Sequence, residues 1–99
     1  MLFTIKQAKH EIVANDGWRI FKYVRVNGKY RIAEGEGFFC PSHKDMLNSG
    51  EVATSASYIH IKKHKLYLGD WSMTLQVGKA HDDAANLAEL LDVPLGEDA

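Results

Sequence analysis

The sequence has a single cysteine, Cys40, among its 99 residues. One cysteine cannot form an internal disulfide, and small secreted domains usually carry several cysteines. The opening segment lacks the long apolar run of a signal peptide, and no stretch approaches the roughly 20 apolar residues of a membrane span. We therefore expect a cytoplasmic protein that is neither exported nor embedded in a membrane.

Signatures of catalysis and cofactor binding are also missing. Gly35-Glu36-Gly37 is only a fragment of the dinucleotide-binding pattern, and no strand–turn–helix context supports it. No carboxylate pair suited to acid–base chemistry can be recognised, and Cys40 near His43 lacks a third, orienting group. A domain this short also has little depth for a cleft. We expect a non-enzymatic protein without a cofactor.

The residues that are present describe one globular domain over residues 1–99. Hydrophobic residues make up 45% of the chain, enough for one modest core. Charge is divided unevenly: residues 1–78 hold eleven Lys and Arg against seven Asp and Glu, whereas residues 79–99 hold one lysine against six acids. The acidic segment is either a solvated helix with a frayed tail from about residue 93 to 99, or it docks on a basic patch of this chain, a second copy or a partner.

The first half predicts a helix followed by a hairpin. Thr4 and Gln7 have capping-box spacing ahead of apolar residues at helical intervals, and Asn15-Asp16-Gly17 is a stop signal. Residues 18–26 predict a strand, and Asn27-Gly28 a two-residue turn into a second strand. The connector over residues 35–50 is expected to hold a short helix from Pro41 to Leu47, with Phe38-Phe39 anchoring it to the core.

The second half predicts a three-stranded meander and a final helix. Residues 58–62, 65–68 and 71–77 alternate apolar with polar positions, with Lys63-His64 and Gly69-Asp70 as turns. Residues 82–91 carry one apolar stripe, and Asp82 or Asp83 can cap that helix. The predicted fold is α+β, an antiparallel sheet with helices on one face, in the order α-β-β-(short α)-β-β-β-α.

A protein-binding surface is the first functional hypothesis. It uses the face of the hairpin opposite the expected core, where aromatic, aliphatic and basic residues alternate, as at interface hot spots. The residues are Trp18, Ile20, Lys22, Val24, Lys29 and Arg31. The protein would act by occupying another protein's surface, as phage or mobile-element accessory proteins and inhibitors of this size do, and it could also form a homodimer through a sheet edge.

Single-stranded DNA or RNA is the alternative partner. Rings that stack on bases beside cations that attract phosphates are typical of such binding. The polar face of the predicted meander and its turn supply this mixture through Tyr58, His60, Lys62, Lys63, Lys65 and Tyr67. The sequence pI near 6.5 argues against it, because dedicated nucleic-acid binders are usually basic.

A small zinc site is the third hypothesis. Cys40 and His43, then His60 and His64, have spacings that resemble a zinc finger. Structural zinc favours thiolates, however, and this set would hold one cysteine and three histidines. A position within a strand for His60 and within a turn for His64 also makes convergence difficult. The sequence therefore favours no metal.

Overall fold

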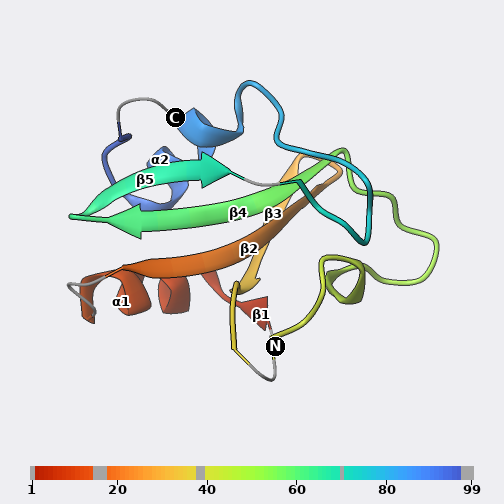
Figure 1. The fold of residues 1–99 in the computed structure, drawn as a ribbon, viewed down its shortest axis with the longest axis horizontal. Helices are drawn as coiled ribbons and strands as arrows, with labels where there is room; N and C mark the ends of the chain where they lie inside the picture. Colours follow the sequence, from red (N-terminus) through yellow and green to blue (C-terminus); the bar gives the residue numbers. More distant parts are fainter. Residues whose placement is uncertain (1, 15–17, 38–39, 70, 97–99) are drawn as a thin grey trace.

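The computed structural model describes residues 2–14, 18–37, 40–69 and 71–96. Within these ranges the chain forms an α+β fold, a five-stranded antiparallel sheet with two α-helices (Figure 1). The elements are β1 (Leu2–Phe3), α1 (Ile5–Ala14), β2 (Arg19–Val26), β3 (Lys29–Glu34), the 3₁₀ helix η1 (Lys44–Met46), β4 (Ser55–Lys62), β5 (Lys65–Gly69) and α2 (Asp83–Leu91). The strand order across the sheet is β1-β3-β2-β4-β5.

The start of α1 follows the predicted capping box. The Thr4 amide donates to Gln7 Oε1 at 2.8 Å, and the Gln7 amide donates to Thr4 Oγ1 at 3.0 Å. These bonds satisfy two amides that a helix start leaves unpaired. Ala8 and Ile12 are the buried residues of the helix. The predicted stop at residues 15–17 lies outside the described residues.

Two of the three predicted two-residue turns are present, and the third, Gly69-Asp70, includes a residue outside the described ones. Asn27 and Gly28 have φ of 53° and 78°, and Lys63 and His64 have φ of 50° and 62°; positive φ at both central positions is the pattern of hairpin turns. The first turn pairs Val26 with Lys29, as the sequence predicts. Both hairpins therefore have the predicted assignment of side chains to the two faces of the sheet.

One face of the sheet carries both helices. The main core lies between the two helices and this face of the sheet, and it contains buried residues from both helices and from four neighbouring strands. Its members are Ala8, Ile12, Phe21, Tyr23, Ile32, Ile59, Ile61, Leu66, Leu68, Leu87, Leu91 and Val93. This arrangement confirms the prediction that the helices cover a single face.

The prediction of a third meander strand over residues 71–77 is wrong. The segment folds into turns with one isolated bridge between Ser72 and Val77, and the fifth strand of the sheet is β1. Trp71 and Met73, two of the apolar positions in the alternation that predicted this strand, are 56% and 82% exposed. Leu75 and Val77 pack instead on a second buried cluster, formed by Val24, Val26, Ala33, Met46, Ala53 and Ala56. Burial of alternate residues against this cluster produced a strand-like pattern without a strand.

The C-terminal segment corrects a second prediction. Val93 is 8% exposed, the Leu66 amide donates to the Pro94 carbonyl at 2.9 Å, and the Gly96 amide donates to the Leu66 carbonyl at 2.8 Å. Residues 93–96 therefore are not a frayed tail but lie along the edge of β5, while residues 97–99 lie outside the described residues. In the part of the chain that the structure describes, neither helix is long and apolar enough to cross a membrane.

Candidate functional site

The face of the sheet opposite the helices, here called the outer face, is only partly covered. At one end the second buried cluster joins it to η1 and to the 71–77 segment, which gather at the right of the view in Figure 1. At the other end, side chains of β2, β4 and β5 lie in cross-strand rows. Ile20 pairs with His60 and His60 with Tyr67; Lys62 pairs with Lys65. We call this group, with Trp18, the aromatic-basic face: Trp18, Ile20, His60, Lys62, Lys65 and Tyr67.

Rings and cations on the aromatic-basic face contact one another directly. The rings of Trp18 and His60 are stacked, with centroids 6.1 Å apart and an interplanar angle of 14°. Lys62 Nζ lies 5.6 Å from the Trp18 ring centre and 5.9 Å from that of Tyr67, within the range of cation–π attraction. Trp18 is nevertheless 56% exposed, and Lys62 and Lys65 are exposed too. This part of the surface therefore offers flat apolar rings beside accessible positive charge.

Most of the predicted nucleic-acid set thus comes together. His60, Lys62, Lys65 and Tyr67 share the aromatic-basic face, and Lys63 is exposed in the adjoining turn. Tyr58 lies on the same side of the sheet but faces the covered end. Its ring packs edge-on against His43 at 5.0 Å and lies 5.8 Å from Lys22 Nζ.

The predicted protein-binding set is divided. Trp18 and Lys29 are exposed and Ile20 is half-buried, but Val24 is completely buried in the second cluster. Lys22 is only 8% exposed and donates from Nζ to the Pro41 carbonyl at 2.6 Å and to Cys40 Sγ at 3.5 Å. The expectation of a continuous solvent-facing hairpin surface is therefore wrong, because the connector after β3 folds back over half of it.

Arg31 holds this connector in place. Its guanidinium donates to both carboxylate oxygens of Glu51, at 2.6 and 2.7 Å, and to the Met46 carbonyl at 3.1 Å. The Asn48 amide also donates to Glu51. The Arg31 guanidinium, together with this amide, lowers the pKa of the Glu51 carboxyl to about 2. Arg31 is therefore committed to a two-pronged internal ion pair and is not available as a contact for a partner.

The four residues of the zinc hypothesis do not converge. His43 is buried and donates from Nε2 to the Ser57 carbonyl at 2.9 Å. Burial lowers the pKa of His43, although the bond to Ser57 opposes this change. His60 stacks on Trp18, and Cys40 contacts Lys22. Across the described ranges no group of three or more His, Cys, Asp or Glu side chains could hold a metal ion.

A buried polar network, which the sequence did not predict as such, joins α2 to the sheet. Asp83 is fully buried, and its carboxylate accepts bonds from Tyr23 Oη at 2.6 Å, Tyr30 Oη at 2.8 Å and the Ala80 amide at 2.8 Å. Arg25 approaches it at 3.2 Å and binds Asp82 at 2.8 Å. The acidic segment therefore docks on a basic residue of its own chain, one of the alternatives left open by the charge pattern.

The network fixes its own protonation states. Burial alone raises the pKa of the Asp83 carboxyl, but the bonds from Tyr23, Ala80 and Tyr30 outweigh burial and hold this pKa below its ordinary value. Burial and the neighbouring Asp83 carboxylate raise the pKa of the Tyr23 hydroxyl. A charged acceptor and neutral donors are therefore stable together at neutral pH, an arrangement suited to holding α2 on the sheet.

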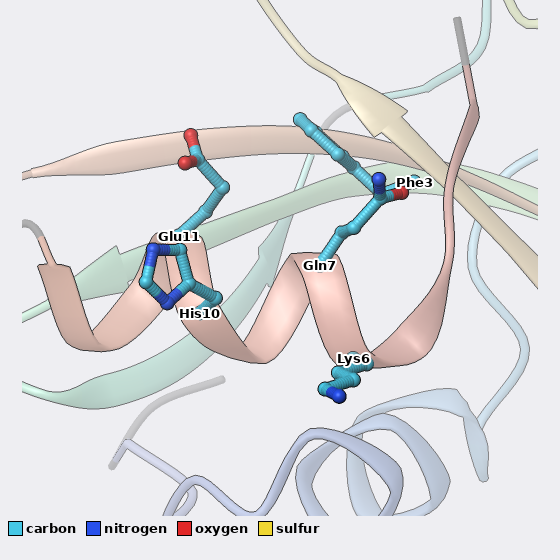
Figure 2. Close-up of a pocket in the computed structure, with 5 residues that line it drawn as sticks. All are labelled: Phe3, Lys6, Gln7, His10 and Glu11. Atoms are coloured by element: carbon cyan, nitrogen blue, oxygen red, sulfur yellow. The ribbon is translucent and has the colours of Figure 1, made fainter.

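A hollow of about 370 Å³ lies beside α1, lined by Phe3, Lys6, Gln7, His10 and Glu11 (Figure 2). Gln7 and Glu11 project toward the sheet side of the view, whereas Lys6 points the opposite way. Glu11 forms an ion pair with Arg19. The side chains do not converge on one point, so the hollow lacks the arrangement of polar groups that fixes a ligand's orientation.

Comparisons with known proteins add no assignment. A scan against protein-family models gives no match, and searches of the curated proteins and of the solved structures give none either.

Proposed function

We propose that the protein binds single-stranded nucleic acid through the aromatic-basic face. The observation that carries the proposal is the exposed Trp18 ring stacked on His60, with Lys62 beside it and Lys65 on the next strand. Rings provide stacking surfaces for bases of any sequence, and lysines attract the phosphates. The proposal places the protein in the cytoplasm, where a free cysteine such as Cys40 is ordinary.

The near-neutral net charge does not conflict with this proposal. Glu51 is paired with Arg31, Asp82 and Asp83 share Arg25, and α2 with its acids lies on the helix-bearing face. Lys62 and Lys65 lie on the opposite face of the sheet. A strand approaching the outer face therefore meets positive charge, although the protein as a whole has a net charge of −1.

Fluorescence anisotropy with a labelled single-stranded oligonucleotide tests this function. Trp18→Ala should weaken binding by about 5- to 150-fold, the effect of losing one stacked base. Lys62→Ala should weaken binding and make it less sensitive to salt, because one phosphate contact is lost. Lys9→Ala is the matched control, since it removes the same charge from an exposed position on α1, across the sheet. No binding by the wild type at low salt, or equal losses for Lys9→Ala and Lys62→Ala, would rule out the proposed surface.

Occupation of another protein's surface is the second candidate function. It is favoured by Trp71 and Met73, large apolar side chains that are 56% and 82% exposed in the 71–77 segment. Met73 also lines a small hollow with Lys22 and Tyr58 on the outer face. In this case the protein would be an accessory or inhibitor protein. Crosslinking to a specific protein that is lost in Trp71→Ser with Met73→Ser, but kept in Val52→Ser, would support this alternative.

A further inference from the structure

Lys62 lies between two rings, so the aromatic-basic face presents the order ring, positive charge, ring. Its ammonium is 5.6 Å from the Trp18 ring centre and 5.9 Å from the Tyr67 ring centre. The ring centres can be no further apart than these two distances laid end to end. A single strand with splayed bases has the same order, in which one linking phosphate lies between two flat bases.

The same geometry argues against a cationic ligand. Pairs of aromatic rings commonly bind ammonium groups by cation–π attraction. Here Lys62 already lies over both rings, so a second cation would be repelled, whereas an anion would be attracted. The exposed lysine can also move away from the rings, because its four-carbon stem is flexible.

We propose that the aromatic-basic face recognises a single internucleotide step, with its linking phosphate on Lys62 and its two bases on Trp18 and Tyr67. In the free protein Lys62 covers part of both rings. When the strand binds, its ammonium turns to the phosphate and the bases occupy the ring surfaces that it leaves. This inference rests on the proposed function and adds to it the size and chemistry of the recognised unit.

The two ends of this surface differ in their surroundings. On one side, Trp18 immediately precedes β2, the strand whose Ile20 and Lys22 continue the outer face toward the covered end. On the other side, a side-chain carbon added at Gly96 would lie 2.2 Å from ring carbons of Tyr67, so the C-terminal segment closely borders that ring. The Tyr67 end of the aromatic-basic face is thus bordered by the C-terminal segment.

Trp18 fluorescence tests the inference directly. In a Trp71→Phe background, Trp18 is the remaining tryptophan of the sequence, so its emission reports on this face. The probes are a thymidine dinucleotide with one charged phosphate, the same dinucleotide with a neutral methylphosphonate, and the thymidine mononucleotide. We expect the charged dinucleotide to quench Trp18 and to bind about tenfold more tightly than either of the other probes.

Variants at Lys62 separate a specific phosphate contact from general attraction. Lys62→Ala should bind the charged and neutral dinucleotides equally, Lys62→Arg should restore the difference, and the neighbouring Lys65→Ala should keep it. Equal binding of the two dinucleotides by the Trp71→Phe protein, while a longer oligonucleotide still binds, would overturn the single-step inference and leave the proposed function standing. If the oligonucleotide fails to bind as well, the proposed function itself fails.

Discussion

Replacing Asp83 by Ala should destabilise the fold strongly, because this carboxylate is the shared acceptor of a buried network. Tyr23 is fully buried, and the substitution leaves its hydroxyl without the acceptor that lies 2.6 Å away. It also removes the acceptor of the Ala80 amide. Tyr30 keeps a bond from Asn86, and Arg25 keeps Asp82. Removing one member of a buried charged network typically costs about 3–5 kcal/mol in the free energy of unfolding.

The size of this loss makes the prediction easy to measure. In a domain of this length each kcal/mol lowers Tm by about 4–8 °C, so Asp83→Ala should lower Tm by about 12 °C or more. Urea denaturation gives the free energy itself. Tyr23→Phe removes a single hydrogen-bond donor and should lower the free energy of unfolding by about 1–2 kcal/mol. Asp82→Ala is the matched control, because this neighbouring aspartate also binds Arg25 but its side chain is 42% exposed.

The pH dependence provides a second measurement of the same network. The pKa of Asp83 is lower in the folded protein than in an unfolded chain, so its contribution to stability is complete above the unfolded value of about 4. That contribution is lost as the pH falls through the folded pKa. The stability difference between wild type and Asp83→Asn should therefore narrow in acid. A loss below about 1 kcal/mol for Asp83→Ala at neutral pH would refute the assignment of Asp83 as the central acceptor.

Three further outcomes follow from the structure. Gly35→Ala should lower Tm, because the added carbon would lie 2.8 Å from backbone atoms of Ile20, and thermal melting will show whether it does. Arg31→Gln should free the connector and speed limited proteolysis within residues 40–50 while leaving oligonucleotide binding unchanged; an unchanged cleavage pattern would contradict the anchoring role. The lowered pKa of His43 means that stability falls as the pH drops below about 6.5, and His43→Phe should lack this slope in urea titrations across that range.

Local signals in the sequence were sufficient to predict the hairpins. Asn27-Gly28 and Lys63-His64 each fixed a turn, and each turn fixed which side chains share a face. The grouping of His60, Lys62 and Tyr67 on the outer face follows from this register alone. Their proximity to Trp18 required the order of the strands, which places β2 beside β4. That order depends on contacts distant in the sequence, which local patterns do not encode.

The incorrect predictions share a physical cause. Which part of a sheet face is covered depends on where a loop folds back, and the burial of Val24 and Lys22 is produced by the connector and the 71–77 segment. The sequence pattern also does not reveal that Asp83 is buried. Two aspartates ahead of an apolar stripe have the pattern of an ordinary helix start, and only the packing of α2 brings Asp83 under Tyr23 and Tyr30.

The two borders of the sheet are occupied by segments from opposite ends of the sequence. Leu2–Phe3 pairs with β3 on one side, and residues 94–96 bond to Leu66 on the other. Unpaired strand borders promote association between molecules. Shortening the chain at either end would therefore expose backbone donors and acceptors of β3 or β5. Proteins shortened by these few residues should therefore form larger assemblies.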